Sequence, residues 1–276
     1  MNVKVKLGAL ATAAMLALVA VPVAAPAAAP AATSDANWTL GGKPCKLIPV
    51  PVAFPLGTGP CPGVRPGAIV NTDKGQCTFN FLFTGSDGER YIGTAGHCIL
   101  DGGGGDAGEM TWLPGMGPEA RDRNEARIGE FVYAILQDPK DFALIRLDPG
   151  IFADPQMCHF GGPTGINADM GSVVLHYYGN GVGVGLAFPA RTGFALGMPD
   201  PDHVFAQGLV VPGDSGAGII SDDGRAVGVI VTVGVHSGSL LALDAGTVGI
   251  TRLAPQVARA SQVLGIGLTL QTAPTL

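Results

Sequence analysis

The protein has 276 residues, of which only 14% are charged, and its formal net charge at pH 7 is −6. A chain of this length buries a sizeable core in one or two domains. An acidic, lysine-poor chain lacks the basic patch that nucleic-acid binding requires, which argues against a nucleic-acid partner. Because hydrophobic residues make up 47% of the chain, we expect a folded, loop-rich, all-β protein despite the 43 Gly and 22 Pro.

The first residues show the succession of basic, apolar and small-residue regions that is typical of a secretory signal peptide. Lys4 and Lys6 precede an apolar run over 7–21, and small residues and prolines follow it. The alternative is a membrane anchor, but this run is shorter than the ~20 residues of a transmembrane helix. We therefore expect a signal peptide over 1–31 and a secreted, extracellular protein without membrane attachment, with cleavage after Ala31 or after Ala36.

Export makes the five cysteines candidates for disulfide bonds. None forms a CxxC pair, so a zinc site has little support, and the odd number leaves at least one thiol unpaired or bridged between chains. Residues 32–66 are rich in Pro and Gly and have no periodicity, which predicts an irregular arm tied down by disulfides. The cysteines are Cys45, Cys61, Cys77, Cys98 and Cys158.

Short β-branched or aromatic runs bounded by turn residues follow from Cys77 onward. Many short strands without intervening helical patterns favour a barrel or a sandwich. One helix is predicted near the end, where Val257, Ala260 and Val263 recur at helical spacing and Gly265 ends the pattern. We predict strands in the runs 77–85, 90–100, 126–136, 141–148, 171–179, 216–224 and 225–234.

The run "TAGHC" over 94–98 brings His97 to the end of a predicted strand. A histidine in a β protein is more often structural, and the four other histidines keep that interpretation. His97 differs because Cys98 follows it and Cys77 begins the preceding strand. This spacing suits a Cys77–Cys98 disulfide that clamps the strand leading to His97.

Two further polar residues stand at the edges of apolar runs. Asp141 opens "DFALIRLD", whose apolar residues would draw it towards the core, where a carboxylate needs a partner. Ser215 lies in "VPGDSGAGII", and its neighbours Gly213 and Gly216 permit a tight turn. A serine needs an imidazole to accept its proton and a carboxylate to orient that imidazole. His97, Asp141 and Ser215 are therefore the candidate catalytic residues, with the amides of Gly213 and Ser215 as candidate oxyanion-hole donors.

The motifs "TAGHC", "DFALIRL" and "GDSG", in this order, resemble those of trypsin-like (chymotrypsin-fold) serine peptidases, in particular the shorter bacterial secreted members. The resemblance spans roughly 77–265. It implies an all-β fold of two six-stranded antiparallel β-barrels with a C-terminal helix and an active site in the cleft between them. The first barrel would comprise 67–157 and the second 158–276. No cofactor and no metal are implied, and the partner would be a peptide or protein substrate.

The resemblance also implies a substrate pocket and a second disulfide. Leu209, six residues before Ser215, would lie at the base of the pocket, and Thr232, Val233 and Gly234 would form one wall. Because the leucine offers no charge to pair with Lys or Arg, cleavage should favour apolar side chains. By the same resemblance Cys158 would tether the arm, through Cys61 or through Cys45.

The carboxylate of Asp214 would point inward in this family, where an unpaired charge costs several kcal/mol. In animal members a freed N-terminus pairs with it. The run "AIVN" over 68–71 resembles such a start but lies too close to Cys77 and follows a poor cleavage sequence. An internal arginine is then expected. Arg191 lies between apolar stretches and is the best candidate among Arg191, Arg225, Arg252 and Arg259.

These inferences predict a secreted serine endopeptidase that acts through an acyl-enzyme intermediate. The alternative is a catalytically silent homologue that binds a peptide or protein in its cleft. A third possibility, esterase activity on small substrates, would use the same residues. The order of an intact triad favours the peptidase.

Overall fold

The computed structural model describes residues 38–40, 43–45, 61–101, 107–168, 174–181, 189–233 and 247–276. The chain divides into two compact units, Met1–Ala36 and Asn37–Leu276, and every described residue belongs to the second. The expected signal peptide and most of the arm lie outside the described residues. Where the chain is described, none of its helices has the length and apolar character that crossing a membrane requires.

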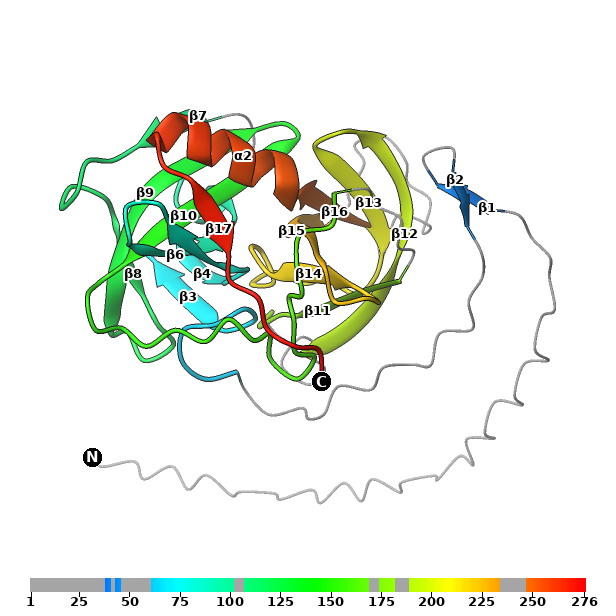
Figure 1. Ribbon diagram of the computed structural model, residues 1–276, viewed down its shortest axis with the longest axis horizontal. Helices are drawn as coiled ribbons and strands as arrows, with labels where there is room; N and C mark the ends of the chain where they lie inside the picture. The colour runs from blue at the N-terminus through cyan, green and yellow to red at the C-terminus, as the bar shows by residue number, and fades with distance from the viewer. Residues whose placement is uncertain are drawn as a thin grey trace, which may run out of the picture. The chain divides into compact units, whose positions relative to one another are not determined.

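A nine-stranded antiparallel sheet forms the first half of the second unit. Eight strands follow the order β17-β5-β6-β10-β9-β8-β3-β4, and β7 pairs with β9. The sheet curls around its own core (Figure 1). Its strands are β3 (Ile69–Thr72), β4 (Gly75–Thr78), β5 (Leu82–Gly85), β6 (Arg90–Thr94), β7 (Gly108–Thr111), β8 (Glu119–Arg121), β9 (Arg127–Gln137), β10 (Lys140–Leu147) and β17 (Leu268–Leu270).

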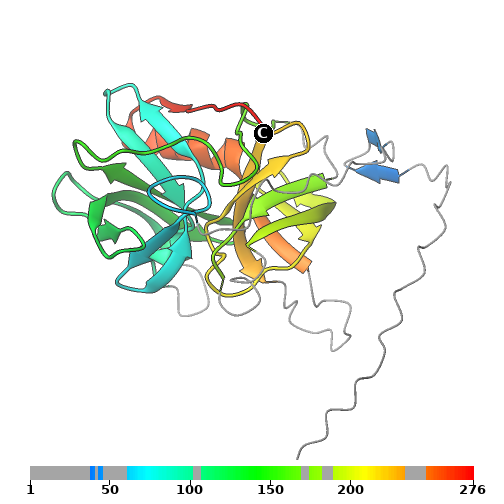
Figure 2. The same ribbon diagram turned by 90° about the horizontal axis from the view of Figure 1, so that it is seen from below.

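A closed six-stranded barrel forms the second half, in the order β11-β12-β13-β16-β15-β14. Figures 1 and 2 show the two halves side by side. This arrangement confirms the predicted all-β, chymotrypsin-like fold class. The barrel strands are β11 (Val174–Tyr178), β12 (Ala190–Asp200), β13 (His203–Gln207), β14 (Gly218–Ser221), β15 (Ala226–Val233) and β16 (Thr247–Arg252).

The first half has more than the six strands expected from the resemblance. Residues 268–276, which we call the C-terminal strap, leave the second half and add β17 to the edge of β5. The strap then returns, where Gly162 N donates to Pro274 O and Leu276 N donates to Phe160 O. The strap, which we expected within the second barrel, therefore contacts both halves.

The predicted helix is present as α2 (Leu253–Leu264). Its buried face includes Val257 and Ala260, and it ends at Gly265, whose φ of 68° is left-handed and favours glycine. The helix packs against β15, β16 and β17. Apolar residues at helical spacing thus bury one face of the helix against both halves of the molecule.

The arm is tied to the first half at its C-terminal end. Cys61 forms a disulfide with Cys158, one of the two pairings that the sequence left open. Arg65 adds an ion pair with Asp154 and donates from Nε to Gln156 O at 3.1 Å. Upstream, the short strands β1 (Trp38–Leu40) and β2 (Lys43–Cys45) pair with each other. Ala68 donates its amide to Arg65 O, and Ile69, the second residue of the "AIVN" run, begins β3.

Candidate active site

His97 and Asp141 are in direct contact. His97 Nδ1 lies 2.6 Å from Asp141 Oδ2, and His97 N donates to Asp141 Oδ1 at 3.0 Å. The side chain of Asp141 is 9% exposed and that of His97 is 32% exposed. Two contacts to one carboxylate fix the imidazole, with one face open to solvent.

The register of the first sheet explains this pairing. Ala143 of β10 lies opposite Thr94 of β6, so continuing the register places Asp141 opposite Gly96. Gly96 begins the short 3-10 helix η1 (Gly96–Cys98), which carries His97. A Cβ on Gly96 would lie 2.0 Å from Ile135 O, so only glycine lets η1 pack against β9. The close packing of η1 brings His97 to the carboxylate.

The environment of His97 sets its pKa. Burial lowers the pKa of His97, but the hydrogen bond that its ring donates to Asp141 and the negative charge of Asp141 together raise the pKa by more, to above the ordinary value of 6.5. Asp141 therefore stabilises the protonated imidazole. An imidazole held in this way can accept a proton and keep it while a reaction proceeds.

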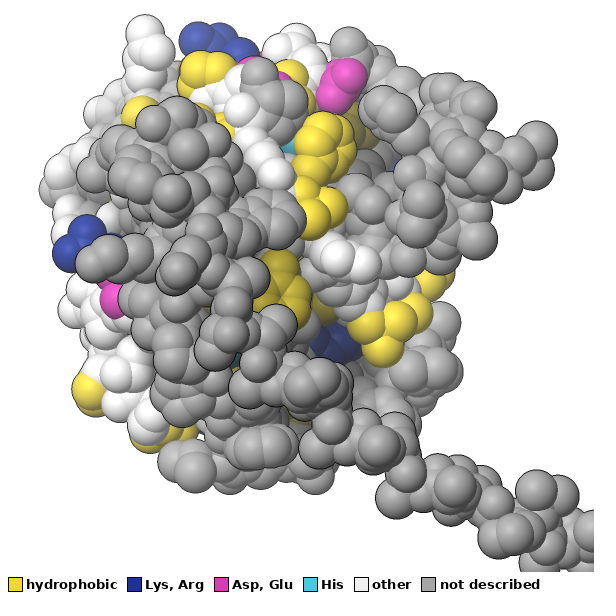
Figure 3. Space-filling model, turned by 90° about the vertical axis from the view of Figure 1, so that its right-hand side faces the viewer, with side chains coloured by type: hydrophobic (Ala, Val, Ile, Leu, Met, Phe, Trp, Pro, Cys, Tyr) yellow, Lys and Arg dark blue, Asp and Glu magenta, His cyan; other side chains and the backbone are white. Residues whose placement is uncertain are grey.

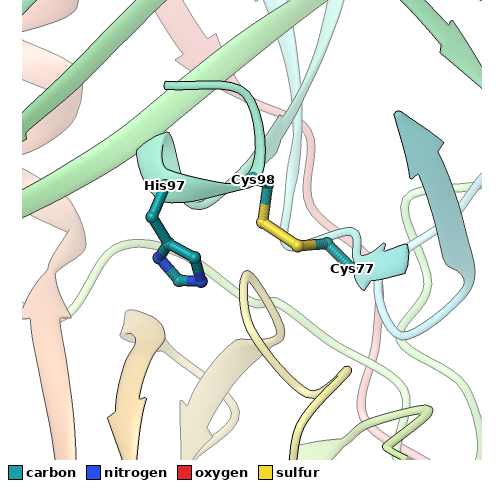
Figure 4. Close-up of side chains that lie close together, drawn as sticks. All are labelled: Cys77, His97 and Cys98. Carbon is teal, nitrogen blue, oxygen red and sulfur yellow. A yellow bond between two sulfur atoms is a disulfide. The ribbon is translucent and has the colours of Figure 1, made fainter. Parts of the chain in front are cut away.

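A disulfide holds η1 to β4. Cys98 Sγ is bonded to Cys77 Sγ, and the two Cα atoms lie 6.2 Å apart. Figure 4 shows His97 and Cys98 on η1, with the disulfide running from Cys98 to Cys77. These three side chains are the one close group of metal-ligand type in the described chain. Because both sulfurs are consumed by the disulfide, the group does not offer a metal site.

Ser215 lies on a tight turn that precedes β14. Asp214 N donates to Val211 O at 3.0 Å, and Ala217 N donates to Asp214 O at 2.9 Å. Gly213 has a φ of 98°, which favours glycine. Over the described chain, the amides of Gly213 and Ser215 donate to no other group. The turn thus leaves the N–H groups of two half-buried residues without a hydrogen-bond partner among the described residues.

Arg191 and Asp214 form a buried ion pair beneath this turn. Their side chains are 5% and 0% exposed. Both terminal nitrogens of Arg191 donate to the carboxylate, the Nη2–Oδ1 contact at 2.8 Å. Gly181 N and Val211 N donate to the same carboxylate at 2.7 and 2.8 Å. Burial lowers the pKa of Arg191, but Asp214 raises it further, so the guanidinium stays charged.

Close packing surrounds the pair. Arg191 of β12 lies opposite Tyr177 of β11 in the barrel register, and its guanidinium carbon lies 5.4 Å from the Tyr177 ring centroid. A Cβ on Gly179 would lie 2.2 Å from Asp214 Oδ1, so this position requires glycine. The aromatic ring and the backbone leave little freedom for either charged side chain.

Thr78 and Thr94 join the two parts of the site. Thr78 N donates to Ser215 O at 2.8 Å, and Thr94 Oγ1 donates to Thr78 O at 2.9 Å. Thr94 ends β6, three residues before His97. A Cβ on Gly216 would lie 2.2 Å from Thr94 Oγ1 and 2.9 Å from Ala95 N. The Ser215 turn is thus packed directly against the segment that leads to His97.

The contact between Ser215 and His97 is not formed in this structure. Within the described residues Ser215 Oγ has no hydrogen-bond partner, and the side chain is half-buried. Catalytic hydrogen bonds are often long or poorly aligned without substrate and tighten when it binds. The structure therefore brings the backbones of the three candidate residues to one place without closing the last hydrogen bond.

The predicted pocket is only partly described. Leu209 is 45% exposed, and its carbonyl accepts hydrogen bonds from Tyr177 and from Arg191 Nη1, the latter at 2.7 Å. Thr232 and Val233 lie at the end of β15. Gly234 lies outside the described residues. Figure 3 views the molecule from the side of the second half, where described hydrophobic side chains reach the surface.

Sequence reasoning did not identify two residues that hold this site, Thr78 and Asn180. Asn180 O accepts a hydrogen bond from Gln76 Nε2 at 3.0 Å, and Asn180 Nδ2 donates to Gly67 O. Both are fully or nearly fully buried polar residues, Thr78 at 0% exposure and Asn180 at 5%. Polar residues at such positions require partners, but their sequence positions do not indicate which ones.

Comparison with known proteins identifies the fold. No family model matches the sequence, and no curated protein matches it. Among solved structures, protease A of Thermobifida fusca superimposes with a TM-score of 0.51 at 14% identity, covering 75% of this chain and 99% of that one. A Nocardiopsis protease gives 0.48 at 18% identity, with 74% and 98% covered. An α-lytic protease homologue gives 0.46 at 16%, with 74% and 97% covered. The likeness to protease A shows that this chain has the chymotrypsin-type fold of that enzyme.

Proposed function

We propose that this protein is an exported serine endopeptidase with His97, Asp141 and Ser215 as its catalytic triad. The observation that carries the proposal is the His97–Asp141 pair, held on the same segment against which the Ser215 turn packs. The fold adds support, since the superimposed protease A shares it. The two disulfides suit an extracellular protein.

The proposed reaction follows from the roles of these groups. Ser215 Oγ attacks the carbonyl carbon of a peptide bond while the Nε2 of His97 accepts its proton. The tetrahedral intermediate then collapses, the C–N bond breaks, and His97 returns the proton to the leaving amine. Water repeats these steps on the acyl-enzyme and releases the second product. Asp141 orients the imidazole and stabilises its positive charge throughout.

The unpaired amides of Gly213 and Ser215 would bind the negative oxygen of the intermediate. Such donors act only where charge develops, and loss of one typically lowers kcat about 10²–10³-fold. Arg191 neutralises Asp214 without any cleavage of the chain, which removes the need for a freed N-terminus. The proposed site therefore needs no new N-terminus to neutralise Asp214.

Specificity for apolar side chains is the finer part of the proposal. Leu209 would face the substrate side chain, with Thr232, Val233 and Gly234 forming a wall. The support is that Leu209 is partly exposed while its carbonyl is held by Tyr177 and Arg191. A peptide library should show cleavage after apolar residues, because no charge at this position pairs with a basic side chain. A preference for Lys or Arg would overturn this assignment.

The test of the proposed function is labelling of the mature protein with a fluorophosphonate. We expect a covalent adduct on Ser215, located by peptide mapping, and hydrolysis of peptide substrates. Ser215→Ala should lose both, with turnover falling by about 10⁶-fold, while its thermal unfolding stays near wild type. A wild-type protein that binds peptides without labelling or cleaving them would instead support the silent homologue.

A further inference from the structure

Thr78 makes contacts that the proposed chemistry has not used. It lies in β4 of the first half, yet its side chain and its backbone both contact the Ser215 turn of the second half. Thr78 Oγ1 donates to Gly213 O at 2.8 Å, and Thr78 N donates to Ser215 O at 2.8 Å. Gly213 and Ser215 are the two residues whose amides are the proposed oxyanion-hole donors. One residue thus holds the carbonyls of both.

The hydroxyl of Thr78 has one hydrogen, and its partners determine where that hydrogen goes. Asn180 N donates to Thr78 Oγ1 at 3.4 Å, so the oxygen acts as acceptor there. The hydrogen is then directed to Gly213 O, which cannot donate. Thr78 is 0% exposed. Because water does not reach this hydroxyl, both of its hydrogen bonds are made within the protein.

The backbone of the turn gives these contacts a mechanical role. Gly213 has a φ of 98° and lacks a side chain that would restrict its rotation. Asp214 is fixed by Arg191 from below, but that pair does not restrain the carbonyls on either side of it. Thr78 supplies this restraint from the opposing half. Fixing both carbonyls limits the rotation of the residues whose N–H groups would bind the oxyanion.

The position of Thr78 is itself fixed. The adjacent Cys77 is joined to Cys98, the residue after His97, and Thr94 Oγ1 donates to Thr78 O. Thr78 therefore lies on a frame that also carries the candidate general base. A displacement of the turn relative to His97 would have to break the Thr78 contacts first.

We propose that Thr78 is a positioning residue that holds the nucleophile turn and its oxyanion-hole amides in register with His97. The role rests on the proposed peptidase function. Thr78 does not touch substrate and acts through Gly213 and Ser215. Its contribution should therefore appear in the transition state, in which the oxyanion exists, rather than in binding of the ground state.

The test compares Thr78→Val with Thr78→Ser. Valine keeps the shape and the backbone N–H but removes the hydroxyl, whereas serine keeps the hydroxyl. For Thr78→Val we expect kcat to fall by at least about 10-fold with KM within about two-fold of wild type. The affinity for a peptide boronic acid, which mimics the intermediate, should fall in parallel with kcat. Thr78→Ser should restore most of the loss.

Ser221→Ala is the matched control. Ser221 is 1% exposed, and its Oγ donates a hydrogen bond to Arg225 O at 3.1 Å. It lies at the end of β14 that is farther from the Ser215 turn. This change removes a buried hydroxyl and should lower stability while leaving kcat near wild type. If Thr78→Val lost no more kcat than Ser221→Ala, in an active wild-type background, the positioning role would be refuted alone. A wild-type protein that neither labels nor hydrolyses would refute the peptidase function and this role with it.

Discussion

The two halves of the molecule hold their parts of the site by different means. In the first half a covalent bond, Cys77–Cys98, fixes the segment that carries His97. In the second half an ion pair, Arg191–Asp214, fixes the turn that carries Ser215, and the described residues of that barrel contain no disulfide. A disulfide acts mainly on the unfolded state, whereas a buried ion pair matters most when one partner is removed.

The hydrophobic cores of the two halves also differ in the side chains that fill them. Large aromatic side chains fill much of the core of the curled sheet. The core of the closed barrel is mainly aliphatic, with Tyr177 as the one aromatic side chain among its described buried residues. The first core includes Phe79, Phe81, Phe83, Phe131, Tyr133 and Phe142, and the second includes Leu175, Val204, Ile219, Val227, Ile230 and Ile250. Two halves of one site are thus built on two kinds of packing.

Among the variants that test this comparison, the largest effect is expected from Asp141→Asn, which changes the polar pair of the first half and leaves its disulfide intact. Asparagine cannot hold the imidazole in the required tautomer and charge state, so kcat should fall about 10⁴-fold. The measurement is steady-state hydrolysis of a peptide substrate. A loss of less than about 10-fold would show that Asp141 does not orient the base.

The pH dependence of Asp141→Asn tests whether Asp141 is what raises the pKa of His97. The pKa of His97 is raised above 6.5 in the wild type, and a general base must be neutral, so kcat/KM should fall as the pH drops through this raised value. In Asp141→Asn the two raising effects are lost and burial, which lowers the pKa, remains. The acid limb of the pH profile should therefore move to lower pH. A shift to higher pH would contradict the assigned cause.

Arg191→Met removes the ion pair that fixes the Ser215 turn in the second half. Asp214 would be left buried without its cation, which costs about 3–5 kcal/mol. We expect reduced stability in urea and strongly reduced fluorophosphonate labelling, even though the triad is unchanged. Arg191→Lys keeps the charge but loses the planar two-pronged contact. Its stability and its labelling should therefore lie between those of the wild type and those of Arg191→Met. Wild-type labelling by Arg191→Met would show that the turn does not depend on the pair.

Replacing both Cys77 and Cys98 with alanine removes the disulfide that fixes the His97 segment in the first half. The bridge closes a separation of 21 residues, for which loop entropy predicts a loss of about 3 kcal/mol. We also expect reduced kcat, since η1 carries His97. The matched control removes Cys61 and Cys158, which close a longer loop of 97 residues but lie outside the site. Thermal unfolding and kcat, measured on both variants, should separate stability from activity.

The smallest effect is expected from Arg259→Ala. Arg259 of α2 contacts Glu109 of β7 at 2.6 Å, but the arginine side chain is 45% exposed. Exposed ion pairs contribute little because water and salt screen them. Thermal unfolding should change slightly at low salt and not measurably at high salt. A loss of stability comparable to that of Arg191→Met would mean that burial does not explain the difference between the Arg191–Asp214 and Arg259–Glu109 ion pairs.

The candidate site residues are easier to recognise in the sequence than the residues that support them. His97, Asp141 and Ser215 stand in recognisable motifs, and the scarcity of basic residues in the second half points to Arg191, which does contact Asp214. The role of Thr78 is not readable in the same way. Its contact to Gly213 spans 135 residues and arises only when β4 meets a turn of the other half.

The strands were also unequally predictable. The seven predicted runs cover strands of both halves, but they miss β3, β7, β8, β12, β13, β16 and β17. Gly197 and Pro199 interrupt the alternation of β12, where the pairing with β13 also shifts register. The strap strand β17 has three residues, too few for a pattern. The choice of Cys61 over Cys45 depends on where the arm lies in space, since spacing alone leaves the connectivity open.

The C-terminal strap has a consequence for the order in which the site forms. A ribosome synthesises residues 268–276 after both halves, so the strap can contact β5 and residues 160–163 only after those segments have been made. They join segments far apart in sequence, and such closures are slow relative to local folding. The other strands of the first half, and all six strands of the closed barrel, can pair before the strap adds β17 and joins the two halves. Alignment of the two parts of the candidate site would then depend on the contacts that the strap makes with both halves.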